Sequence, residues 1–111
     1  MACSVVSYDE AFGMRERQVE RYLVKQVEKH GGQAPKLTCP GLSGMPDRLV
    51  LLPGARVIFV ELKQPGQKLR PLQIKRATEL RALDFTVYCL DCPEAVDEFI
   101  RKEVSPGDCC L

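Results

Sequence analysis

A Pro53-Gly54 turn between two short apolar runs is the feature that most restricts how this chain can fold. Residues 48–52 end in four consecutive aliphatic side chains, and residues 57–60 are β-branched or aromatic. Two such runs on either side of a glycine-containing turn predict a β-hairpin. Because residues 57–60 are continuously apolar, we expect this second strand to be covered on both faces.

Three charged residues lie at the end of this hairpin that is opposite the turn. Glu61 and Lys63 follow the second strand, and strand alternation places them on one face. Asp47, which precedes the first strand, joins them only if the loop has an odd number of residues centred on Gly54, such as residues 53–55. A slip of one residue would move Asp47 to the other face.

In the favoured register, two carboxylates and an ammonium group converge. Carboxylate oxygens suit hard cations such as Mg²⁺ or Mn²⁺. A lysine beside them can stabilise developing negative charge or orient a nucleophilic water. The alternative is that Asp47 is a turn residue and that Glu61 and Lys63 form a solvated strand end. The spacing alone leaves both interpretations open.

Pro46-Asp47, thirteen intervening residues and Glu61-Leu62-Lys63 resemble the signature of the PD-(D/E)XK nuclease superfamily. The flanking residues resemble the VRR-NUC domain, in particular its small stand-alone form found in phages and bacteria. The resemblance runs from about residue 14 to residue 100 and rests on Gly31-Gly32, Lys36, the stretch 44–48, the stretch 59–63, Pro65-Gly66, Gln73 and Leu80.

This resemblance implies a metal-dependent DNA endonuclease whose product carries a 5′-phosphate. Asp47 and Glu61 would bind one or two Mg²⁺ or Mn²⁺ ions, with the backbone carbonyl of Leu62 as a further ligand. Lys63 would orient or help to deprotonate the nucleophile and stabilise the transition state. Gln73 would support that arrangement.

A glutamate of the first helix completes the metal shell in VRR-NUC domains, directly or through water. Glu16 and Glu20 both lie one turn before a residue of the apolar stripe that we expect on this helix. The pattern Arg15-Glu16-x-x-Val19 matches the family better, which favours Glu16. The alternative is that each glutamate is a surface charge near the helix start, where the helix dipole favours acids.

The remaining periodicities predict a layered α/β domain with a mixed sheet and flanking helices, in the order αβββαβα. This order agrees with a PD-(D/E)XK restriction-endonuclease-like core. We expect one domain over residues 1–111, with a core over about 14–104 and a loose tail over 105–111. The predicted helices cover 14–30, 72–83 and 93–103, and the predicted strands cover 33–39, 48–52, 57–60 and 86–90.

Basic residues cluster directly after the candidate site. Exposed cations near a metal site are typical of contacts with a phosphate backbone, although they also solubilise ordinary helices. Lys36 matches a lysine of the family. The predicted DNA-binding residues are Lys36, Arg48, Lys68, Arg70, Lys75 and Arg76.

Composition excludes some other classes of protein. The 111 residues are 45% hydrophobic and 28% charged, with a formal net charge of +1, and no run is long enough to span a membrane. The N-terminus lacks the features of a signal peptide, so we expect a cytoplasmic protein of a bacterial or phage-infected cell. The six cysteines include Cys89-x-x-Cys92 and Cys109-Cys110. Incidental reduced thiols explain them better than a zinc or redox site.

The leading hypothesis is therefore a structure-selective DNA endonuclease, acting as a homodimer on branched DNA such as the four-way (Holliday) junctions of recombination and repair. Two symmetric nicks need two sites, which supports a twofold dimer. A second hypothesis is a non-catalytic DNA-binding or assembly subunit that retains the nuclease fold. A third is a cysteine-based zinc or redox protein.

Overall fold

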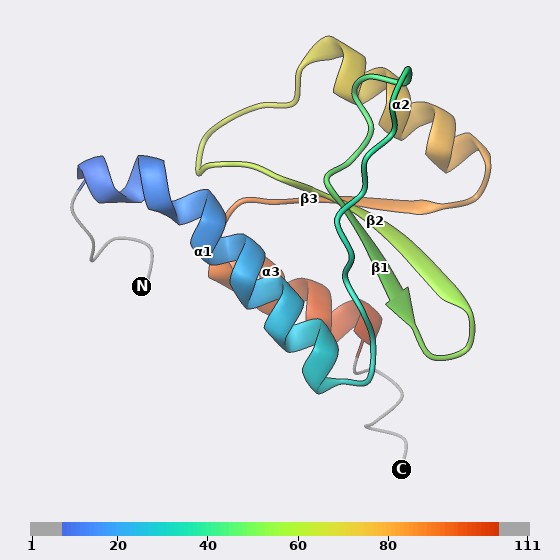
Figure 1. Cartoon of the computed structure of the whole chain (residues 1–111), viewed down its shortest axis with the longest axis horizontal. Helices are drawn as coiled ribbons and strands as arrows, with labels where there is room; N and C mark the ends of the chain where they lie inside the picture. The colour runs from blue at the N-terminus through green and yellow to red at the C-terminus, as the bar shows by residue number, and fades with distance from the viewer. Residues whose placement is uncertain (1–7, 105–111) are drawn as a thin grey trace.

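The computed structural model describes residues 8–104, with side chains described from Glu16 onward. The chain forms α1 (Tyr8–Lys29), β1 (Arg48–Leu52), β2 (Arg56–Leu62), α2 (Pro71–Ala82), β3 (Thr86–Leu90) and α3 (Pro93–Phe99), which continues as the π-helical turn η2 (Ile100–Val104). Helices α1 and α3 lie beside each other, and α2 lies apart from them across the sheet (Figure 1). This arrangement confirms the predicted α/β class with a mixed sheet.

The sheet has three strands in the order β1-β2-β3. Strand β1 pairs antiparallel with β2, so that Arg48 lies opposite Val60 and Leu52 opposite Arg56. Strand β3 pairs parallel with β2, with Cys89 opposite Glu61 and Leu90 opposite Leu62. The central strand β2 is buried from Ile58 to Leu62, as its apolar run predicted.

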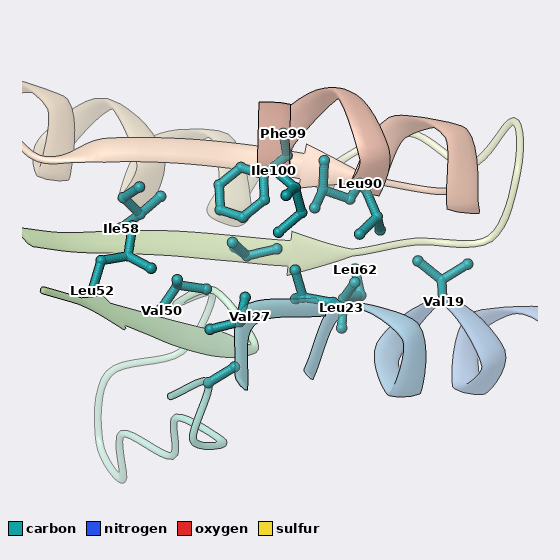
Figure 2. Close-up of a cluster of buried hydrophobic side chains, with 13 residues drawn as sticks. Val19, Leu23, Val27, Val50, Leu52, Ile58, Leu62, Leu90, Phe99 and Ile100 are labelled. Carbon is teal, nitrogen blue, oxygen red and sulfur yellow. The ribbon is translucent and has the colours of Figure 1, made fainter. Parts of the chain in front are cut away.

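The hydrophobic core fills the space between the sheet and the pair α1 and α3 (Figure 2). The expected stripe of α1 is fully buried there, with Val19, Leu23 and Val27 each 0% exposed. The even-numbered residues of β2 meet these side chains from the sheet, as strand alternation requires. Phe99 of α3 closes the layer and packs edge-to-face on Tyr88, with ring centroids 4.8 Å apart.

Helix α2 covers the other face of the sheet with a stripe that matches only part of the expected one, which comprised Leu72, Ala77 (or Arg76), Leu80 and Leu83. Ala77 and Leu80 are buried as expected, whereas Leu72 and Leu83 are exposed and Gln73 is buried instead. The spacing of 73, 77 and 80 still follows one helical face. A glutamine takes the inward position because its amide finds hydrogen-bond partners there, which an apolar pattern cannot reveal.

The expected strand over 33–39 is wrong, although its backbone does follow β1. Gln33 and Leu51 exchange both of their backbone hydrogen bonds, and the Leu49 amide donates to the Pro35 carbonyl. Pro35 has no N–H to return that bond. The ladder is therefore reduced to two isolated bridges, at Gln33 and Lys36, and the sheet has three strands instead of four.

The first helix is longer than predicted at its start only. Helix α1 begins at Tyr8, six residues before the predicted start at residue 14, and its last residue is Lys29. Gly31, whose φ is 88° and whose N–H bonds to the Glu28 carbonyl, caps it, as expected from the Gly31-Gly32 pair that follows the predicted helix. The predicted tail over 105–111 lies outside the described residues.

Candidate active site

The hairpin register brings the two candidate metal ligands together. The turn is the three-residue loop 53–55, in which Gly54 and Ala55 both have positive φ. Extending the register one step past Arg48 and Val60 places Asp47 opposite Glu61. The Asp47 carboxylate accepts a hydrogen bond of 3.0 Å from the backbone N–H of Leu62, and its charge acts on Glu61.

Glu61 is a buried carboxyl group beside a second one. Burial raises its pKa, the charge of Asp47 raises it further, and Lys63 only partly opposes them, so that the pKa of Glu61 is about 7. Glu16 also contributes to the rise. Two carboxylates held together at low exposure repel each other when both are ionised. A cation at this position would relieve that repulsion.

Gln73 connects Glu61 to the start of α2. The side-chain oxygen of Gln73 accepts a hydrogen bond of 2.8 Å from the Arg70 backbone N–H. This bond fixes the orientation of the amide, so that its NH₂ group faces the sheet. That group donates a hydrogen bond of 2.7 Å to the Glu61 carboxylate. The predicted polar residue at the helix start is therefore buried and holds a catalytic candidate in place.

Lys63 lies on the same side as Glu61, as alternation predicted. Its Nζ atom is 3.9 Å from a Glu61 oxygen, and its side chain is 13% exposed. Its backbone N–H donates to the Leu90 carbonyl at 3.1 Å, which anchors it to the end of β3. The ammonium group is thus held close to the two carboxylates while it keeps one open side.

The structure separates the two glutamates of α1. Glu20 accepts two hydrogen bonds from the Arg48 guanidinium, at 2.7 and 3.0 Å, and lies 3.6 Å from Lys36. Burial alone would raise the pKa of Glu20, but its bonds to Arg48 lower it below the ordinary value. Glu16 is half-buried and close enough to influence Glu61 electrostatically. Of the two glutamates, Glu16 is the one that stays clear of the Arg48 ion pair and acts on Glu61 by its charge, and its place in the site remains a prediction.

The donor set fits a magnesium-type ion only in part. Among the side chains described from Glu16 to Val104, no group of three or more His, Cys, Asp or Glu residues is close enough to hold a metal by itself. Mg²⁺ is usually bound by one or two carboxylates, with water and substrate phosphates as the other ligands. Asp47 and Glu61 meet that smaller requirement. The roles of Glu16 and of the Leu62 carbonyl as ligands remain predictions.

The six predicted DNA-binding residues fall into two groups. Lys68, Arg70 and Lys75 are exposed around the start of α2, and Arg76 beside them donates to the Ser43 carbonyl and pairs with Glu79. Arg48 is mostly buried and bonded to Glu20 and the Ala34 carbonyl, which gives it a structural role. Lys36, whose side chain is 68% exposed, keeps its charge accessible. Contact with DNA stays a prediction for all six.

Two neighbours of the site have surroundings that the sequence did not indicate. Cys89 lies inside β3 as expected, but it is exposed and lies beside Glu61 across the β2–β3 pairing. Burial, followed by the charge of Glu61, raises the pKa of its thiol. Gly44 has a φ of 87°, and a Cβ there would lie 2.8 Å from Leu72. The absence of a side chain at Gly44 therefore lets the loop before β1 pass close to α2.

The cysteine-based hypothesis has no support in the described part of the chain. Cys39, Cys89 and Cys92 are free, and no metal-binding group includes them. The other three cysteines lie outside the described residues. Among residues 8–104, no helix combines the length and apolar character that a membrane crossing requires.

Comparison with known proteins identifies relatives of the whole domain. No family model matches the chain. A protein named "Putative nuclease p44", from Acyrthosiphon pisum secondary endosymbiont phage 1, is 47% identical over 78 residues, which cover 70% of this chain and 84% of that protein. A solved structure of a VRR_NUC domain matches with a TM-score of 0.76 and 32% identity, over 80% of this chain and 97% of that one. On its fold and its relatives, this chain belongs to the VRR-NUC family of nucleases.

Proposed function

We propose that this protein is a divalent-metal-dependent, structure-selective DNA endonuclease that hydrolyses phosphodiester bonds in branched DNA. The observation that carries the proposal is the Asp47–Glu61 carboxylate pair, with Lys63 on its open side and Gln73 behind it. This combination of two carboxylates and a lysine suits phosphodiester hydrolysis.

Each side chain has a role that follows from its position. Asp47 and Glu61 would hold Mg²⁺ or Mn²⁺, which lowers the pKa of a bound water and neutralises charge on the scissile phosphate. Gln73 keeps the Glu61 carboxylate oriented through its short hydrogen bond. Lys63, close to Glu61 but still partly open, would orient the nucleophilic water and stabilise negative charge in the transition state.

The surroundings of the carboxylates supply a path for a phosphate backbone. An open hollow at the start of α2 is lined by residues 43–44 and 70–73, and so includes Gln73. The exposed cations Lys68, Arg70 and Lys75 border this region. Positive side chains next to a hollow at the catalytic groups favour a strand of DNA that enters from the α2 side.

The preference for branched DNA and the homodimer rest on the family resemblance. A domain of 111 residues offers little surface for a four-way junction, and two symmetric nicks need two active sites. The phage origin of the relative supports activity in the cytoplasm of a bacterial or phage-infected cell.

Cleavage of a panel of substrates tests this proposal. Linear duplex, nicked, flap and four-way DNA should be incubated with Mg²⁺, with Mn²⁺ and with EDTA. We expect cuts that depend on the metal and fall mainly in the branched substrates. Binding without cleavage under every condition would instead favour a non-catalytic subunit. Equal cleavage of linear and branched DNA would remove the structure selectivity and leave the nuclease activity.

A further inference from the structure

We propose that the outer face of α1 is a second DNA-binding surface, which holds the phosphate backbone on the opposite side of the catalytic carboxylates from α2. This inference rests on the proposed DNA nuclease function. It extends DNA binding to α1, where none of the predicted DNA-binding residues lies. The surface, here called the α1 groove, is an open hollow lined mainly by Arg17, Arg21, Lys25, Glu20, Glu28 and Arg48.

Three cations of the groove lie in one row along the helix. Arg17, Arg21 and Lys25 follow one another at intervals of four residues, so they share a face of α1. All three are exposed, and within the described part of the chain none forms an ion pair. With a rise of 1.5 Å per residue, the row is about 12 Å long. That length corresponds to roughly three to four phosphates of one DNA strand.

The acids of the groove do not cancel this charge. Glu20 is already neutralised by two hydrogen bonds from Arg48, and Lys36 lies close to the same carboxylate. Glu28 remains as one acid against three free cations. The groove therefore has an excess of positive charge along its length, as expected for a surface that binds a polyanion.

The spacing of these cations is poor for helix stability. Like charges four residues apart repel each other on a helix surface. Arg17 and Lys25 each have an acid three residues further on, at Glu20 and Glu28, but among the described residues neither cation forms an ion pair with it. Arg76 and Arg101, in contrast, do pair with acids three residues away, Glu79 and Glu98. The contrast suggests that the row on α1 is maintained for binding rather than for folding.

The α1 groove adjoins the residues of the candidate site in the sequence. Arg17 directly follows Glu16, whose charge acts on Glu61, and Arg48, which lines the groove, directly follows Asp47. Neighbouring strand residues point to opposite faces, so Arg48 faces α1 while Asp47 faces the α2 side. DNA that lies along the row would therefore pass the carboxylates at the Glu16 end. Cations on α2 and on α1 would then hold the backbone on both sides of the scissile phosphate, which suits a substrate with more than one arm.

The double variant Arg21→Gln/Lys25→Gln tests this inference against the matched control Arg101→Gln/Lys102→Gln. Both variants remove one exposed arginine and one exposed lysine, and the control lies outside the groove. Binding to a four-way junction is measured in EDTA between 50 and 200 mM salt. We expect the groove variant to lose about two units of slope in the plot of log affinity against log salt, with at least about tenfold weaker binding at low salt.

Cleavage provides a second readout. In the groove variant the substrate concentration for half-maximal rate should rise while the rate at saturating DNA stays close to wild type, because these cations do not touch the carboxylates. Binding and salt slope equal to those of the control would overturn the inference and leave the proposed function intact. Wild-type protein that neither binds nor cuts DNA would overturn both. Circular dichroism verifies that each variant folds.

Discussion

The two faces of the sheet have different tasks. The core under α1 and α3 is apolar, with the Arg48–Glu20 ion pair beside it, and Val19, Leu23, Val27, Val60 and Phe99 are buried there almost completely. The face under α2 buries a shorter apolar row next to a polar cluster that contains Glu61 and Gln73. Most of the stabilising apolar burial therefore lies on one face of the sheet and the candidate site on the other. Substitutions at the site should consequently leave the protein folded.

The largest expected effect on stability comes from the apolar face. Leu23→Ala removes a fully buried side chain and leaves a cavity, which should lower the free energy of unfolding by about 3 kcal/mol. Urea unfolding measures this change. Leu83→Ala on the α2 side, at a leucine that is 68% exposed, should change it by less than about 0.5 kcal/mol. Equal losses from both substitutions would contradict the division between the two faces.

On the polar face, the comparison predicts a pH dependence of stability. Burial and the neighbouring Asp47 raise the pKa of Glu61 from 4.5 to about 7. The folded state therefore binds more protons than the unfolded state between these values, and the stabilisation present below pH 4.5 is lost as the pH rises to about 7. The whole shift corresponds to about 3 kcal/mol.

Glu61→Gln isolates this contribution. Unfolding in EDTA should show the wild type losing stability relative to the variant between pH 4.5 and 8, while the variant has no nuclease activity. Added Mg²⁺ should restore stability to the wild type at pH 8 but not to the variant. Parallel curves of stability against pH for the two proteins would show that the pKa of Glu61 is not raised in the folded state.

A smaller loss is expected where α2 meets the carboxylate. Gln73→Ala removes the hydrogen bonds to Glu61 and to the Arg70 backbone, which should cost about 1–3 kcal/mol and slow cleavage at least tenfold. Gln73→Glu keeps the acceptor for Arg70 but places a third carboxylate against the Asp47–Glu61 pair, so it should restore the helix start without restoring activity. Ile74→Ala, at a residue of the same helix that is 52% exposed, is the control.

The smallest effect is expected at the residues that follow the ends of α1 and α2. Two residues after α1 lies Gly31 with a φ of 88°, and two residues after α2 lies Asp84 with a φ of 72°. In both cases a backbone N–H of the next residue reaches back to the last turn. Asp84→Gly should stabilise the protein by about 0.5–1 kcal/mol, and Gly31→Asp should destabilise it by a similar amount. Thermal unfolding of both variants measures these changes. An unchanged midpoint temperature for either variant would contradict the prediction.

The sequence predicted best what depends on local geometry. The three-residue loop 53–55 determined the hairpin register, and the register determined that Asp47 and Glu61 would meet. The stripe of α1 and the glycine at its end also followed from spacing alone.

The sequence failed where contacts between distant segments decide the outcome. Arg48 and Glu20 are 28 residues apart, and nothing local indicated that their ion pair would bury Arg48. Gln73 is buried because Glu61 and the Arg70 backbone satisfy its amide, so apolar periodicity assigned that position to Leu72 instead. Pro35 left the segment beside β1 without a regular ladder. The first two errors came from a polar group whose partner lies elsewhere in the chain, and the third from a residue that lacks a backbone donor.

Single-turnover cleavage by Asp47→Ala and Asp47→Asn tests most directly whether the Asp47–Glu61 pair is the catalytic centre. We predict that with Mn²⁺ both variants cut a four-way junction at least about 10³-fold more slowly than wild type. Binding of the junction in EDTA and the cooperative thermal transition should persist in both. A variant that folds, binds and still cleaves at the wild-type rate would show that the Asp47–Glu61 pair is not the catalytic centre.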